Sequence, residues 1–150
     1  MTIPSVFQTN SPEETEAVGA ALANQMKQTP TLPPFVALYG DLGVGKTAFI
    51  RGFTAELAPH ARVKSPTFAL VHEYRGEALS VFHFDMYRID GEDDLYSIGY
   101  DDYLDRGICL VEWSENIPYA LPDSYLRVTI EKCSADAPDE RIISIESVQQ

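Results

Sequence analysis

The chain has 150 residues, of which 45% are hydrophobic and 23% are charged, a composition typical of one globular domain over residues 1–150. Its 23 acidic residues against 11 Lys and Arg give a net charge of −12, which argues against unaided binding of nucleic acid. No apolar run is long enough to span a membrane, and the N-terminal sequence lacks the basic and apolar segments of a signal peptide. We therefore expect a cytoplasmic protein in which Cys109 and Cys133 are reduced.

The first third of the chain predicts a helix, a strand and a second helix. The sequence SPEE (11–14) is a capping-box signature that opens a helix of about four turns, which ends before the Pro-rich stretch 30–34. The apolar run FVALYG (35–40) predicts a strand covered on both faces. Residues 46–58 predict a helix whose inward-facing side chains are Phe49, Ile50, Phe53 and Leu57.

The middle of the chain predicts a hairpin followed by short helices. Two segments rich in β-formers, ALVHEY (69–74) and ALSVFHF (78–84), are separated by the turn residues 75–77. The next stretch, residues 90–107, is acidic with scattered Leu, Ile and Tyr. We predict short helices there, divided at Gly99.

The last third predicts three strands. ICLVEW (108–113) has the continuous apolar pattern of a buried strand. YLRVTIEKC (125–133) and ERIISIES (140–147) alternate apolar and polar residues around a polar turn, which predicts an antiparallel pair at one edge of a sheet. Together the elements predict an α/β, three-layer fold of the P-loop NTPase kind, with a mixed sheet and an antiparallel C-terminal strand pair.

A glycine-rich loop lies between the predicted strand 35–40 and the helix that follows. Gly40, Gly45, Lys46 and Thr47 match the pattern G-x-x-x-x-G-K-[ST] in the context that this motif requires. Such a loop wraps its backbone N–H groups around phosphates at the positive end of a helix dipole. Lys46 is predicted to reach the β- and γ-phosphates of a nucleotide, and the Thr47 hydroxyl to bind Mg²⁺.

Several residues outside the loop are candidates for the same site. Asp85 and Glu112 each end an apolar strand and could hold the metal or its water, although either could be an ordinary polar residue at a strand end. Thr67, in SPTF, could approach the metal as a switch threonine does, or could lie in a plain turn. Trp113 is equally compatible with a core position and with a wall of the nucleotide pocket. The pattern favours His83 as a buried strand histidine over a catalytic base.

Four segments in order, GDLGVGKT, VKSPTF, HFDMYR and LVEWSE, closely resemble the TsaE family over roughly residues 10–130. This is a family of bacterial ATPases that assist threonylcarbamoylation of an adenosine in the tRNA anticodon loop. The resemblance implies Mg²⁺ on Thr47 and Glu112, a switch-like loop at Thr67, Asp85 as a Walker-B-like acid, and Trp113 beside the nucleotide. It also implies that the ATP phosphates contact the loop residues Asp41, Leu42, Gly43, Val44, Gly45, Lys46, Thr47 and Ala48.

The resemblance further implies partners. The family acts on a complex of TsaD and TsaB, resetting it by ATP hydrolysis, so tRNA would be met only indirectly through these partners. The net charge of −12 agrees with this, because a strongly acidic protein is unsuited to binding tRNA directly. We expect a slow ATPase on its own, because the sequence presents no evident arginine finger. Lys46 is expected on an exposed loop, where its replacement would leave the fold intact.

Two other functions remain open from the residues alone. A small P-loop kinase would carry an Arg-rich lid and an acceptor pocket, yet only Arg88 and Arg106 lie in the middle region. A non-hydrolysing nucleotide-binding regulator would lack competent catalytic groups, which Thr67, Asp85 and Glu112 argue against. No N-K-x-D base-reading motif occurs, so a GTP-specific switch protein is disfavoured.

Overall fold

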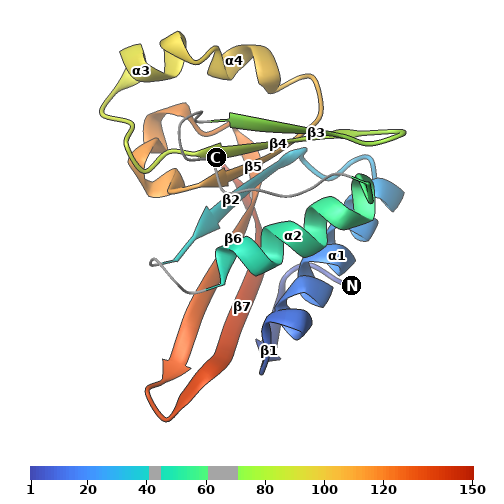
Figure 1. Ribbon diagram of the computed structural model, residues 1–150. Helices are drawn as coiled ribbons and strands as arrows, with labels where there is room; N and C mark the ends of the chain where they lie inside the picture. Colours follow the sequence, from blue (N-terminus) through green and yellow to red (C-terminus); the bar gives the residue numbers. More distant parts are fainter. Residues whose placement is uncertain (41–44, 61–70) are drawn as a thin grey trace.

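The computed structural model describes residues 1–40, 45–60 and 71–150, and it contains a seven-stranded sheet flanked by helices (Figure 1). The strand order is β1-β7-β6-β2-β5-β4-β3. The strands are β1 (Ser5–Thr9), β2 (Phe35–Tyr39), β3 (Val71–Arg75), β4 (Ser80–Asp85), β5 (Ile108–Glu112), β6 (Ser124–Ser134) and β7 (Ala137–Gln149). The helices are α1 (Pro12–Gln28), α2 (Lys46–Leu57), α3 (Glu92–Ser97) and α4 (Tyr100–Tyr103), with single 3₁₀ turns η1 (Ser114–Asn116) and η2 (Pro118–Ala120).

The centre of the sheet is parallel and its margins are antiparallel. Strand β2 pairs in parallel with both β5 and β6, and β4 pairs in parallel with β5. Four of the five residues of β2 and of β5 are buried, as the continuous apolar runs predicted, because helices cover both faces there. The predicted mixed sheet and the antiparallel C-terminal pair β6–β7 are confirmed.

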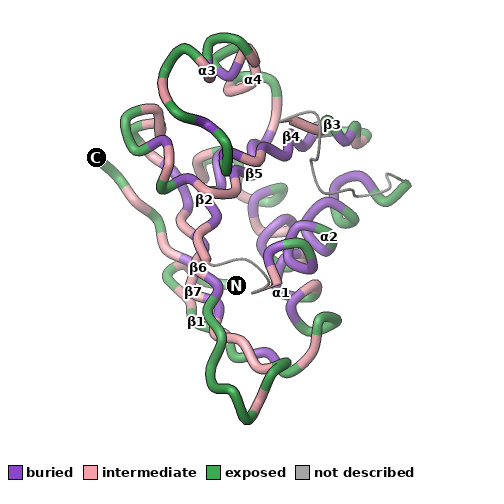
Figure 2. Tube along the Cα trace, turned by 60° about the vertical axis from the view of Figure 1, so that its left-hand side comes forward, coloured by how far each residue is buried: buried purple, intermediate pink, exposed green. Residues whose placement is uncertain are grey.

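The sheet separates two apolar cores. Val36 and Leu38 of β2 point into a core shared with α1 and α2, whereas Phe35 and Ala37 point into a second core on the opposite face. Leu95 of α3 and other buried side chains of the α3–α4 and η1–η2 segments complete that second core. Figure 2 shows the buried positions concentrated in the central strands and on the inward sides of α1 and α2. This arrangement confirms three layers.

The local predictions for the helices hold in detail. Ser11 caps α1, since its Oγ accepts from the Glu14 N–H at 3.2 Å. The Glu14 carboxylate accepts from the Asn10 N–H at 3.0 Å, one residue before the position that a regular capping box uses. The acidic stretch forms α3 and α4, and Gly99 divides them with a φ of 70°.

One part of the sequence prediction was wrong: the C-terminal pair does not form the edge of the sheet. Strand β1, which the sequence did not predict, pairs antiparallel with the outer side of β7, placing Phe7 opposite Ile143. Only its last residue is fully buried, so the segment carries little of the apolar pattern that marks a strand. None of the helices in the described part of the chain is long and apolar enough to cross a membrane.

Candidate functional site

The candidate site lies where three parallel strands end. Leu38 of β2 is opposite Glu112 of β5, and Glu112 is opposite Asp85 of β4. The glycine loop begins directly after β2, and α2 begins at its far end. The carboxyl ends of parallel strands are the usual place for a ligand in open α/β sheets.

The backbone around the glycine loop requires glycine at both described ends. Gly40 has a φ of 142° and Gly45 a φ of 105°, values that side chains disfavour. Gly45 is the N-cap residue of α2 and has no side chain to accept from the first N–H groups. The first turn of α2 contains no Asp or Glu. The first N–H groups of this helix therefore have no side-chain cap from Gly45 and no acidic side chain in their own turn. The predicted site residues Asp41, Leu42, Gly43, Val44 and Thr67 lie outside the described residues.

Lys46 is buried, in contrast to the exposed position expected from the sequence. Lys46 is the first residue of α2 and is only 5% exposed. The Nζ atom donates to the Gly40 carbonyl at 2.7 Å and lies 4.4 Å from the centre of the Trp113 ring. The ammonium group is thus held between Gly40 and Trp113 by a hydrogen bond and a cation–π contact.

Trp113 contacts both the second core and Lys46. It is a non-glycine residue with a φ of 59°, a conformation that is uncommon for a bulky side chain and that collects at functional sites. Its ring lies 5.0 Å from the ring of Tyr87 and packs against the second core, while Lys46 contacts it. This backbone conformation turns the chain directly after Glu112.

Glu112 has a fixed orientation. The Nε2 atom of His83, which is 2% exposed, lies 2.6 Å from Glu112 Oε2 and donates to it. The His83 Nδ1 atom is buried and has no hydrogen-bond partner among the residues that the structure describes. Since one carboxylate oxygen is engaged by the imidazole, the other remains for a ligand at the strand ends. The prediction of a buried strand histidine is correct for His83, but the residue also serves the candidate site.

Asp85 lies beside Glu112 and is half-buried. Burial raises the pKa of its carboxyl above the ordinary value of 3.8, and the neighbouring Glu112 carboxylate also raises it. The Tyr87 N–H, which donates to Asp85 Oδ1 at 3.0 Å, opposes this shift, as do His83 and Lys46. Two carboxyl groups therefore share one edge of the sheet in different environments.

The donor set fits a magnesium ion bound together with phosphate. Thr47 is exposed in the first turn of α2, and Glu112 offers one oxygen that His83 does not engage. Within residues 1–40, 45–60 and 71–150, no group of three or more His, Cys, Asp or Glu could hold a metal. Mg²⁺ is usually held by one or two protein oxygens together with substrate phosphates and water, so Thr47 and Glu112 suffice. Ala48 is buried, so only its backbone can face the loop.

Arg141 lies beside Gly45 and was not predicted as part of the site. A Cβ atom at Gly45 would lie 3.9 Å from the Arg141 Nε atom and 4.0 Å from a methyl group of Thr15. Arg141 reaches the loop because β7 pairs with β6 beyond the end of β2, with Arg141 opposite Lys132. Its guanidinium also donates to the Glu140 carbonyl at 3.0 Å. The approach of Arg141 to Gly45 joins residues far apart in the chain, so it leaves no local sequence signal.

The fold and the site define an α/β protein with a glycine-rich loop and two carboxylates at the ends of its parallel strands. The family model described as "Threonylcarbamoyl adenosine biosynthesis protein TsaE" matches residues 9–143. The chain belongs to the TsaE family.

Relatives with the same description extend along most of the chain. The tRNA threonylcarbamoyladenosine biosynthesis protein TsaE of Bacillus subtilis is 38% identical over 143 residues, covering 95% of this chain and 85% of that protein. The protein of that description from Rickettsia conorii is 33% identical over 123 residues, covering 81% and 68% of the two chains. The crystal structure of Bacillus subtilis YdiB aligns with a TM-score of 0.69 and 31% identity, covering 100% of this chain and 88% of that one.

Proposed function

We propose that the protein binds ATP with Mg²⁺ and hydrolyses it slowly, in the service of tRNA threonylcarbamoyladenosine formation. The observation that carries the proposal is the position of Lys46. Lys46 is buried, and its ammonium group lies between the Gly40 carbonyl and the Trp113 ring, near the strand ends where Asp85 and Glu112 lie side by side. A buried cation beside free helix N–H groups is suited to an anion such as a polyphosphate.

Each residue has a role in the proposed chemistry. Lys46 and the N–H groups of the loop bind phosphate oxygens and offset the negative charge that develops during transfer. When bound, Mg²⁺ supplies further positive charge at the phosphates, held by Thr47 and by the Glu112 oxygen that His83 leaves unengaged. Asp85 orients the attacking water, and its raised pKa fits it to accept a proton. The predicted roles of Thr67 and of residues 41–44 complete this scheme.

The contacts of two described arginines, Arg106 and Arg141, support slow hydrolysis by the isolated protein. Arg106 contacts Glu73 at 3.9 Å and lies over the Phe82 ring, away from the site. Arg141 is beside the loop, but its guanidinium is turned to backbone carbonyls of its own hairpin. We propose that the TsaD–TsaB complex completes the site, and that the protein meets tRNA only through this complex, in the cytoplasm. Neither the contacts of Arg106 nor those of Arg141 are those of an Arg-rich kinase lid.

Phosphate release from ATP tests the proposal, with the protein alone, with Mg²⁺ omitted, and with purified TsaD–TsaB complex added. We expect slow, Mg²⁺-dependent release that the complex accelerates. Equal rates with and without the complex would contradict the role of the partner. Transfer of the phosphate to a small molecule in place of water would favour a kinase, and binding without any release would favour a regulator.

A further inference from the structure

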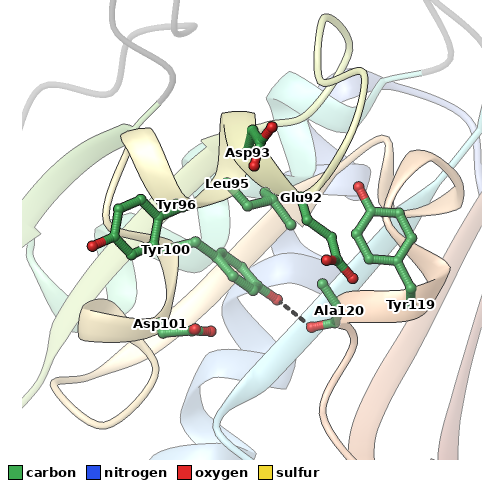
Figure 3. Close-up of a pocket in the computed structure, with 8 residues that line it drawn as sticks. All are labelled: Glu92, Asp93, Leu95, Tyr96, Tyr100, Asp101, Tyr119 and Ala120. Atoms are coloured by element: carbon green, nitrogen blue, oxygen red, sulfur yellow. Dashed lines mark hydrogen bonds between the residues drawn. The ribbon is translucent and has the colours of Figure 1, made fainter.

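A second concave site lies on the face of the sheet opposite α1 and α2. It is a pocket of about 430 Å³ between the α3–α4 segment and η2 (Figure 3). Its lining combines carboxylates with phenol rings: Glu92, Asp93, Asp101, Tyr96, Tyr100 and Tyr119, with Leu95 and Ala120. In the view of Figure 3, Glu92 points from α3 toward Tyr119 and Ala120.

The charge of the pocket favours a cationic occupant. Seven acidic residues lie between Asp90 and Asp105, and this stretch contains no Lys or Arg. Among the described residues, none of the ion pairs involves Glu92, Asp93 or Asp101. An anionic ligand such as a nucleotide would be repelled from this surface. The described part of the pocket also lacks the three grouped ligands that a metal ion would need.

The aromatic side chains indicate a protein surface as the source of that cation. Tyr96 is 89% exposed and Tyr119 is 49% exposed, although both are large rings that gain from burial. Tyrosine is enriched at the centres of protein interfaces, where its ring packs and its hydroxyl stays hydrogen-bonded. Phenol rings beside carboxylates suit the guanidinium of Arg or the ammonium of Lys, through stacking and ion pairing together.

The pocket is connected to the candidate site through its two walls. The α3 wall follows β4, which ends at Asp85, and the η2 wall follows β5, which ends at Glu112. The Tyr100 hydroxyl donates to the Ala120 carbonyl at 3.0 Å and so joins the walls. Nearer the site, Asn116 Nδ2 donates to the Met86 carbonyl at 2.9 Å, and Tyr87 packs on Trp113.

We infer that this pocket is the docking site for a Lys or Arg side chain presented by the protein partner. Because the pocket walls follow β4 and β5, docking there acts on the two strand ends that carry Asp85 and Glu112. The inference rests on the proposed function for the existence of such a partner. The pocket supplies what that proposal lacks, which is a surface of defined chemistry on this chain.

The test compares two variants that lose the same charge. Glu92→Gln with Asp101→Asn removes two carboxylates from the pocket without changing side-chain size. Asp136→Asn with Asp139→Asn removes two exposed carboxylates from the β6–β7 hairpin as the matched control. Affinity for purified TsaD–TsaB complex is measured by biolayer interferometry with ATP and Mg²⁺ present. ATP affinity and thermal unfolding of each variant check that the nucleotide site and the fold are unchanged.

We expect the pocket variant to bind the complex roughly 30-fold more weakly, the scale for a lost interfacial ion pair, and the hairpin variant to bind within about twofold of the original protein. If both variants bound the complex equally weakly, the loss would be explained by general charge attraction, and the inference would be overturned. Unchanged binding by the pocket variant would place the partner elsewhere while leaving the proposed function intact. Absence of binding by the unaltered protein would refute the proposed partner and the inference with it.

Discussion

The two faces of the sheet are covered in different ways. On one face, α1 and α2 pack with their backbones nearly touching: a Cβ at Gly52 would lie 1.9 Å from the Glu16 carbonyl oxygen, and one at Gly19 would lie 2.1 Å from that of Phe49. On the other face, short helices and 3₁₀ turns are joined through side chains such as Tyr100 and Asn116. The first face is therefore a rigid support for the glycine loop, whereas the second presents acidic and aromatic side chains to solvent.

This difference separates stability from function along the chain. Gly19 and Gly52, where α1 meets α2, cannot be replaced by a larger residue without moving the other helix, because backbone atoms cannot move aside as a flexible side chain can. Residues of α3, α4 and η2 contribute few buried side chains, and the exposed ones are free to serve recognition. The candidate site lies at the strand ends between these two layers and depends on both.

The largest expected effect is on the tightly packed face. Gly52→Ala places a methyl group against the α1 backbone and should lower the free energy of unfolding by about 3 kcal/mol in urea denaturation. Gly91→Ala is the control on the other face, because a Cβ there meets nothing within 4 Å. It should change stability by less than about 1 kcal/mol. If both variants lost a similar amount of unfolding free energy, the two faces would not differ in how tightly they are packed.

The second prediction concerns Lys46 at the junction of the faces. Lys46→Ala should lower ATP affinity about 100-fold, because a charge-assisted contact to phosphate is lost, as calorimetry would measure. Since Lys46 is buried and bonded to Gly40, the variant should also be less stable, in contrast to what an exposed loop position would give. Arg51→Ala in the same helix is the control, since its side chain pairs with Glu16 at the surface. Unchanged ATP affinity would refute the phosphate site.

The third prediction tests whether His83 positions Glu112. His83→Leu removes the donor to Glu112 and should reduce the gain in ATP affinity that Mg²⁺ provides by about tenfold. His83→Gln retains an N–H donor and should keep most of that gain. Affinities without Mg²⁺ should be similar in both variants, and a loss of equal size with and without the metal would assign His83 a purely structural role.

The smallest expected effect comes from the raised pKa of Asp85. A raised pKa means that the folded state holds the proton more tightly than the unfolded state, so stability declines as the pH rises above about 3.8 and stays reduced at neutral pH. Asp85→Asn removes this loss and still accepts from the Tyr87 N–H. At pH 7 it should be more stable by roughly 0.5 kcal/mol, a value kept small because solvent screens the half-exposed carboxyl. At pH 3 the difference should vanish. If Asp85→Asn were less stable than the original protein at pH 7, and less so at pH 3, the sign of the pKa shift would be contradicted.

Sequence patterns predicted what local chemistry determines. The α1 cap at Ser11, the buried strands β2 and β5, and the break at Gly99 each depend on a few adjacent residues. Side-chain contacts between residues far apart in the chain were not visible in this way. The contact of His83 with Glu112 follows from the parallel alignment of β4 and β5, and the approach of Arg141 to Gly45 follows from the β6–β7 register.

The burial of Lys46 shows the same limit at the site itself. The motif predicted the identity and neighbours of this lysine, but its burial depends on Trp113, which follows β5 far along the chain. Strand β1 was missed because its pairing partner, β7, lies at the other end of the chain. Sequence therefore indicated the chemistry of the site, and topology determined which side chains support it.

The most direct test of the account is a nucleotide titration followed by the fluorescence of Trp113, the single tryptophan of the chain. Its ring lies 4.4 Å from Lys46 Nζ, so a phosphate that draws the lysine away must change the surroundings of the ring. We predict a saturable change with ATP that is stronger with Mg²⁺ and weaker with GTP. No change in fluorescence, together with no heat of binding by calorimetry, would contradict the claim that this loop binds ATP.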